Sequence, residues 1–188
     1  DFPGGFVWFI EQFMPNAKAF DQMGKITSAL AMTILDAIAA GTLAAVIAFI
    51  LAVIASRVSG VGGPVQMVIR AFATVLRNIP TVAWGFILLF SFKQAEFTGF
   101  LALFFKSLGF LTRAFIETID EADAGSIEAL KATGASRLQI IVHGVFPLSL
   151  TQVVSWVLYM IETNFRDATL VGMLTGTGIG FVFNWYYR

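Results

Sequence analysis

The sequence predicts an all-α integral membrane fold. Hydrophobic residues make up 57% of the 188 residues, and charged residues only 13%. Soluble domains have about 45–50% apolar and about 25% charged residues. Apolar stretches of the roughly 20 residues that cross a bilayer recur along the chain. We therefore expect one membrane domain over residues 1–188, with four spans and a single long polar loop.

The first span is expected over residues 26–56, where dense Ala and Gly would let helices approach closely. Residues 1–25 mix aromatic residues with Pro, Gly and charges, a composition typical of the membrane–water interface. Because the chain begins at Asp1 without a signal peptide, we expect it to be an internal piece of a longer protein.

The second span, residues 65–92, follows a glycine-rich turn and contains Pro80. Proline has no N–H, so it should kink the helix and release a carbonyl near Leu76. Helices broken at membrane depth are tolerated where they line a cavity or pack on protein. An ordinary proline kink is the alternative.

The third span is expected over residues 98–119, where Arg113 and Glu117 are spaced to pair on one helix face. The fourth covers residues 148–161 and extends to 167. The glycine-rich stretch 168–180 then predicts close helix packing and a turn within the membrane. An aromatic belt over residues 181–188 closes the sequence.

Residues 120–147 form the long polar loop, which predicts two short helices joined by a turn. Asp120 is expected to cap the first helix, with further acidic charge in its first turn. Gly134 suits the left-handed position that ends a helix. Ser136 and Gln139 form a capping box for a second helix, and Pro147 should end that helix at Phe146.

This loop resembles the cytosolic loop of inner-membrane permeases of binding-protein-dependent ABC importers. That loop has the pattern E-A-A-x-x-x-G followed, after a spacer, by I-x-L-P. Glu128, Ala129 and Leu130 occupy the E-A-A positions, and Gly134 and Pro147 keep the spacing of the Gly and the Pro, whereas Gly144 and Phe146 replace the Ile and the Leu. An amphipathic hairpin lying on the membrane surface is the alternative interpretation.

Two further stretches resemble the phosphonate branch of this family: R-x-x-P-x-x-x-W over residues 77–84 and E-x-N-x-R-x-A-T-x-x-G over 162–172. The resemblance covers about residues 65–184. It implies a type I ABC importer permease core, in which a further span follows the glycine-rich region. We therefore expect a C-terminal truncation here.

The resemblance implies an ATP-driven importer in a bacterial cytoplasmic membrane, for phosphonate or a related phosphorus oxyanion; another solute such as an amino acid is the alternative. The chain itself would not be an enzyme and would bind no cofactor. Its implied partners are ATPase subunits that hold ATP and Mg, an extracytoplasmic solute-binding protein and a second permease copy in a homodimer. The loop would then be cytosolic, and four crossings would leave both chain ends outside; the Lys and Arg distribution does not decide this.

Two sets of site residues follow from the resemblance. The residues expected to couple to the ATPase are Glu121, Asp123, Glu128, Ala129, Lys131, Gly134, Ala135, Ser136 and Arg137. Those expected to line the translocation pathway are Arg77, Asn78, Pro80, Lys106, Glu162, Asn164 and Arg166.

Asp36 and Lys106 are the charges placed deepest in their spans, at similar depth. Because an ionised side chain facing lipid is costly, both should face the protein interior. Two arrangements stay open. They pair with each other, or Lys106 lines the pathway while Asp36 lies elsewhere.

Other functional classes find less support. A secondary transporter would need intramembrane acids and an inverted repeat, and Asp36 alone qualifies as such an acid. A membrane enzyme would need clustered His, Asp or Ser. The single His, His143, has no His or Cys near it, so no metal site is expected. The acids around residues 117–128 are interpreted as a solvated surface facing a partner.

Overall fold

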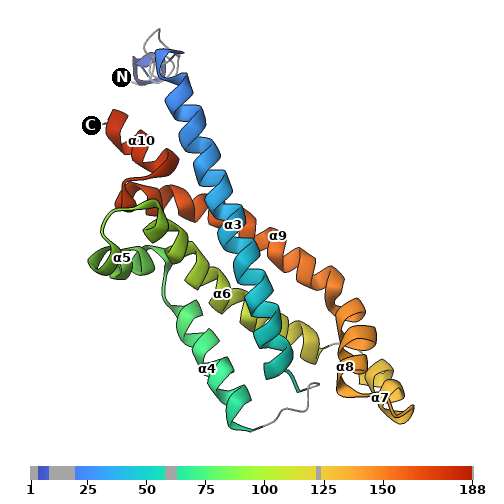
Figure 1. The fold of residues 1–188 in the computed structure, drawn as a ribbon. Coiled ribbons are helices and arrows are strands. Elements are labelled where there is room, and N and C mark those ends of the chain that lie inside the picture. The colour runs from blue at the N-terminus through green and yellow to red at the C-terminus, as the bar shows by residue number, and fades with distance from the viewer. Residues whose placement is uncertain (1–3, 9–19, 58–62, 122–123, 188) are drawn as a thin grey trace.

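The computed structural model describes residues 4–8, 20–57, 63–121 and 124–187, and its main elements are helices (Figure 1). The expected all-α fold is confirmed. Three stretches are long and apolar enough to cross a membrane, and a sharply bent helix pair makes a possible fourth. The elements are α3 (Met23–Ala55), α4 (Pro64–Asn78), α5 (Thr81–Phe92), α6 (Glu96–Asp120), α7 (Ala124–Ala132), α8 (Arg137–Ile140), the π-helix η1 (Ile141–Val145), α9 (Phe146–Thr175) and α10 (Gly178–Tyr187).

Helix α6 lies at the centre and packs against α3, α4, α5 and α9. The helices approach closely because α3 presents a buried stripe of small residues. At Gly41 a side-chain carbon would lie 2.9 Å from Ile161 Cγ1 of α9. The expected role of small residues in the first span is therefore confirmed. The stripe consists of Ala37, Ala40, Gly41, Ala44, Ala48, Ala52 and Ala55.

Pro80 breaks the second span more sharply than a kink. Helices α4 and α5 meet at 95°, so the span over residues 65–92 is broken, and the alternative of an ordinary proline kink is wrong. Ile79 is extended (φ −87°, ψ 119°), as the residue before a proline prefers. The carbonyl expected to be released, that of Leu76, accepts a bond from the Trp84 indole nitrogen at 3.4 Å. This bond lets Trp84 stabilise the break.

Pro147 does not end the second loop helix, contrary to the sequence prediction. Helix α8 continues through η1 into α9, giving one apolar helical stretch from Arg137 to Thr175. Pro147 lies in the first turn of α9, and its ring would otherwise crowd the carbonyl of residue 143. The wider π turn directly before it relieves this clash. The fourth span is consequently longer than the expected 148–167.

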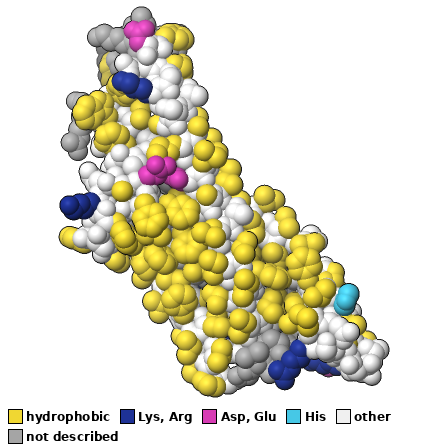
Figure 2. Space-filling view, in the orientation of Figure 1, with side chains coloured by type: hydrophobic (Ala, Val, Ile, Leu, Met, Phe, Trp, Pro, Cys, Tyr) yellow, Lys and Arg dark blue, Asp and Glu magenta, His cyan; other side chains and the backbone are white. Residues whose placement is uncertain are grey.

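The glycine-rich stretch forms a turn, as predicted. Gly176 and Gly178 have φ of 74° and 63°. Helix α10 then folds back on α9, where a side chain on Gly180 would overlap the Thr169 carbonyl. The Ile179 amide donates to Thr33 Oγ1 at 2.9 Å and ties this turn to α3. Hydrophobic side chains cover much of the visible face between the two ends of the molecule (Figure 2).

Candidate functional site

The α7–α8 hairpin lies at the opposite end of the molecule from α10 (Figure 1). Helix α7 ends in a Schellman motif: the Gly134 amide donates to the Lys131 carbonyl at 3.0 Å, and the Ala135 amide to the Leu130 carbonyl at 3.3 Å. Gly134 has φ 78°, so its predicted left-handed conformation is confirmed. The chain therefore reverses here in a fixed geometry.

The second half of the hairpin starts with the predicted capping box. The Ser136 amide donates to Gln139 Oε1 at 2.7 Å, and the Gln139 amide donates to Ser136 Oγ at 3.4 Å. Buried Ile127 and Ile140 join the hairpin to the main hydrophobic core. At Gly144 a side-chain carbon would lie 2.8 Å from Leu130 Cδ1. This contact explains why Gly can replace the family's Ile there: α7 packs closely on η1.

The residues expected to couple to an ATPase lie on the outer surface of this hairpin. All those described are exposed except Ala135, which is half-buried. Asp123 lies outside the described residues. His143 is also exposed, beside this end of the molecule (Figure 2). Their accessibility permits contact with a partner, and their coupling role stays a prediction.

Asp120 does not cap α7; that prediction is wrong. It is the last residue of α6 and accepts from Arg70 Nη2 and from the Arg57 amide, both at 2.7 Å. Arg70 also donates to the Ala55 carbonyl at 3.0 Å. The carboxylate is bound here because the ends of α3, α4 and α6 meet at this point, so it joins three helices immediately before the loop.

Basic residues of α4 and α6 (Arg77, Lys106 and Arg113) lie around Phe110, on the side of α6 next to α9; we call this the polar face. The Arg77 guanidinium lies 5.8 Å from the Phe110 ring centre, and that ring packs 5.7 Å from the ring of Tyr159. Lys106 and Arg113 flank Phe110 along the same side of α6. Arg113 donates to Glu117 at 2.6 Å, which confirms the predicted pair.

On α9 the exposed polar residues recur every three or four positions, so they occupy one side of the helix. Within this stripe Arg166 binds Glu162 at 2.6 Å, with side-chain exposures of 70% and 58%. The stripe consists of Gln152, Ser155, Tyr159, Glu162 and Arg166. Asn78 and Pro80 are exposed at the α4–α5 break. The assignment of these residues to a pathway stays a prediction.

Lys106 pairs with Asp167 of α9, and not with Asp36. Thr81, the first residue of α5, donates to the same carboxylate oxygen at 2.6 Å. Helices α5, α6 and α9 thus meet at the largely buried carboxylate of Asp167, next to the Pro80 break. The expected Asp36–Lys106 pair is wrong, because two side chains at equal depth in a membrane can point in different directions around their helix axes. Asp36 instead borders a small cavity beside Gly99. Asp167 and Thr81 were missed, although both lie within or next to the recognised motifs.

Asn164 is fully buried. Its amide donates to Ser107 Oγ at 2.9 Å and to the Ala37 carbonyl at 3.4 Å. It therefore joins α9 to α6 and α3. In this conformation its side chain reaches no surface that a solute could contact.

The family comparison decides what kind of protein carries this architecture. Residues 45–186 match the family described as binding-protein-dependent transport system inner membrane component. The chain belongs to this family. The predicted permease family is thereby confirmed, and the helices that can span a bilayer fit a multi-pass membrane component.

Relatives with curated descriptions are 30% or more identical to this family member over the aligned residues. Phosphite transport system permease protein PtxC of Stutzerimonas stutzeri is 32% identical over 149 residues, covering 79% of the chain and 54% of the relative. Phosphate-import permease protein PhnE of Mycolicibacterium smegmatis is 30% identical over 161 residues, covering 86% and 30%. The chain thus spans about half the length, or less, of these relatives.

A solved structure described as "Crystal structure of an amino acid ABC transporter with histidines" has a TM-score of 0.74. The match covers 94% of this family member and 86% of the solved chain, at 15% sequence identity. Likeness at this identity shows the fold alone, and that fold agrees with the expected type I permease core.

Proposed function

We propose that this chain forms the solute pathway of an ATP-driven importer for phosphonate, phosphite or a related phosphorus oxyanion. The observation that carries the proposal is the exposed Arg77 guanidinium, which lies over the Phe110 ring and forms no ion pair with any described acid. Lys106, Arg113 and Arg166 lie nearby and are paired with Asp167, Glu117 and Glu162, so these four cations and three acids leave one net positive charge. An anion crossing a low-dielectric region needs such positive charge. The relatives named for phosphite and phosphate transport point to the same substrate class.

A second copy of the permease completes the pathway. Glu162 and Arg166 are mostly exposed on a helix that crosses the membrane. A charged group facing lipid costs on the order of 3 kcal/mol by insertion scales. The α9 stripe is therefore turned toward a second copy, with a water-filled pathway between the two stripes.

The loop over residues 120–147 transmits the work of a separate ATPase. The exposed surface of α7 and the Gly134–Arg137 turn fit into the ATPase, which holds ATP and Mg and carries out hydrolysis. ATP binding shifts the permease only by as much as its affinity differs between the two permease states. An extracytoplasmic binding protein delivers the solute across a bacterial cytoplasmic membrane.

Reconstitution tests this function. The full-length permease, its ATPase and its binding protein are placed in proteoliposomes, and uptake of labelled phosphonate and phosphite is measured with ATP or a non-hydrolysable analogue. We expect saturable, ATP-dependent uptake that unlabelled phosphorus oxyanions inhibit and amino acids do not. Uptake that follows an ion gradient without ATP, or inhibition by amino acids alone, would contradict the proposal.

A further inference from the structure

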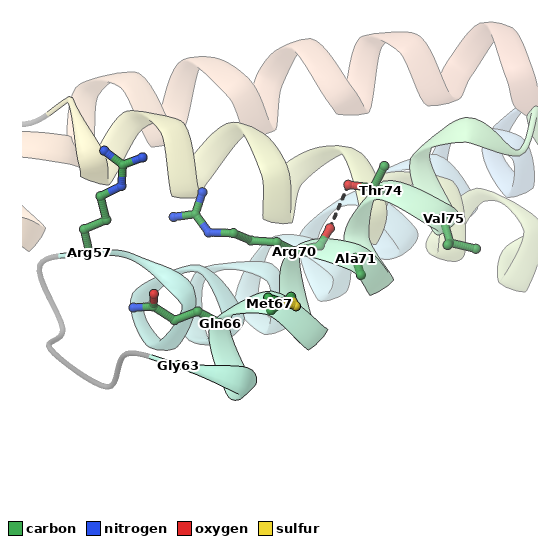
Figure 3. Close-up of a pocket in the computed structure, with 8 residues that line it drawn as sticks. All are labelled: Arg57, Gly63, Gln66, Met67, Arg70, Ala71, Thr74 and Val75. Carbon is green, nitrogen blue, oxygen red and sulfur yellow. Dashed lines mark hydrogen bonds between the residues drawn. The ribbon is translucent and has the colours of Figure 1, made fainter.

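An open cleft of about 700 Å³ runs along α4 on the loop side of the Pro80 break. Its polar end contains Arg57, Gln66 and Arg70. Figure 3 shows the guanidinium groups of Arg57 and Arg70 pointing to the same side of the helix. Its other end is lined by Met67, Ala71 and Val75. Polar and apolar residues alternate along α4, and the cleft changes from Arg57 and Gln66 at one end to Ala71, Thr74 and Val75 at the other.

The charged end has an unbalanced positive charge. Arg70 is paired with Asp120, whose second carboxylate oxygen is occupied by the Arg57 amide. The Arg57 guanidinium forms no ion pair with any described acid, and the residue is exposed. Asp120 is thus the one described acid that forms an ion pair with either arginine. The site favours an anion that approaches Arg57 from the open side.

The apolar end follows one side of α4. Met67, Ala71 and Val75 are four residues apart, so their side chains align along the helix. Met67 and Val75 are 73% and 60% exposed. Arg70 lies between Met67 and Ala71 along α4, and from Arg70 to Val75 the helix rises about 7.5 Å. This apolar strip is continuous with the charged end and points away from the loop.

We infer that this cleft binds an anionic glycerophospholipid of the cytosolic leaflet. This inference rests on the orientation in the proposed function, in which the loop, and hence Arg57, is cytosolic. The arginines then lie at headgroup depth, where anionic lipids concentrate. The part of the strip beyond Arg70, from Ala71 to Val75, lies at acyl-chain depth. A phosphate group with attached hydrocarbon matches both ends, whereas a free phosphate would use only the first.

Lipid retention in the intact transporter tests the inference without requiring transport. The full complex is purified from nanodiscs containing phosphatidylcholine and phosphatidylglycerol, and bound lipid is measured by native mass spectrometry. We expect selective retention of phosphatidylglycerol, reduced several-fold by Arg57→Gln and restored by Arg57→Lys. Lys25→Gln, which removes an exposed charge from the start of α3, is the matched control and should leave retention unchanged.

Further measurements distinguish a lipid in the cleft from a small anion or a second permease copy. Val75→Gln should weaken phosphatidylglycerol retention because it alters the acyl-chain end alone, and excess inorganic phosphate should not displace the lipid. Displacement by phosphate together with an unaffected Val75→Gln variant would overturn the lipid assignment in favour of a small anion. Disulfide formation between Met67→Cys copies, with no lipid retained, would assign the face to a second permease. If uptake proceeds normally while retention is unselective, the lipid inference fails and the proposed function stands.

Discussion

At the scale of single residues, Gly134 separates the effect of backbone conformation from the effect of side-chain packing. Its φ is 78°, and a side-chain carbon there would meet no atom within 4 Å. A β-branched residue should therefore cost about 1–2 kcal/mol through backbone strain alone. We expect Gly134→Val to abolish ATP-driven uptake while membrane insertion persists.

Gly134→Asn is the matched control, because Asn tolerates the left-handed conformation better. It should keep most of the uptake measured in proteoliposomes. Equal loss in both variants would point to a side-chain contact with the partner and against the backbone explanation.

The Lys106–Asp167 pair can be tested by a double-mutant cycle. Side-chain exposures of 23% and 19% leave it largely buried, so removing one partner should destabilise the protein by on the order of 3 kcal/mol. We expect Lys106→Met and Asp167→Asn each to lower the melting temperature, and the double variant to recover it without recovering uptake of the oxyanion. If the double variant also recovered uptake, Lys106 would have a structural role and no direct role in transport.

These residues also show where sequence reasoning stops. Gly134 and the Ser136 capping box were predictable because they depend on neighbours a few positions away. The partner of Lys106 was not, since helix depth gives no information about direction around the helix axis. Asp167 lies within the expected fourth span, but its pairing with Lys106 depends on how α9 is rotated against α6.

At the scale of elements, the α4–α6 contact depends on the absence of a side chain at Gly109. A side-chain carbon there would lie 2.6 Å from the Arg77 backbone nitrogen and 2.6 Å from Leu76 Cβ. Gly109→Val should therefore push the end of α4 away from α6, at a cost of about 1–3 kcal/mol.

Thermal unfolding of the purified permease in detergent measures this effect. Gly24→Val near the start of α3 adds the same side chain where no atom lies within 4 Å, so its melting temperature should stay close to that of the unmodified protein. An equal decrease in both variants would mean that helix propensity, and not the contact, determines the loss.

The two prolines explain why element boundaries were harder to predict than the helices themselves. Both residues were expected to interrupt helices. Pro80 does so at 95°, because Ile79 is extended and Trp84 stabilises the exposed Leu76 carbonyl. Pro147 does not, because the π turn beside it relieves the clash. Whether a proline breaks or joins helices depends on these local accommodations.

At the scale of the whole molecule, the α9 stripe predicts how two copies meet. The 188 residues contain no Cys, so a single introduced thiol reports proximity within this domain. We expect Ser155→Cys to be cross-linked between two copies by a short bifunctional thiol reagent, because its stripe faces the same stripe of the second copy across the pathway.

Val46→Cys serves as the control, since Val46 is 58% exposed on α3 among apolar neighbours and should face lipid. Its cross-linked yield on denaturing gels should remain low. Efficient linkage through Val46 and none through Ser155 would place the dimer contact on the opposite side and remove the proposed pathway from α9.

If an ATPase moves the loop, as proposed, the helical stretch from Arg137 to Thr175 would act as a lever with unequal arms. Its 39 residues measure about 58 Å at 1.5 Å per residue. The buried Asn164, bonded to both α3 and α6, is its fulcrum. The arm toward the loop is then about 40 Å long, and the arm toward Gly176 about 16 Å. A displacement of the loop end would therefore be reduced roughly 2.5-fold at the glycine turn. The force at that end of the helix would be larger by the same ratio.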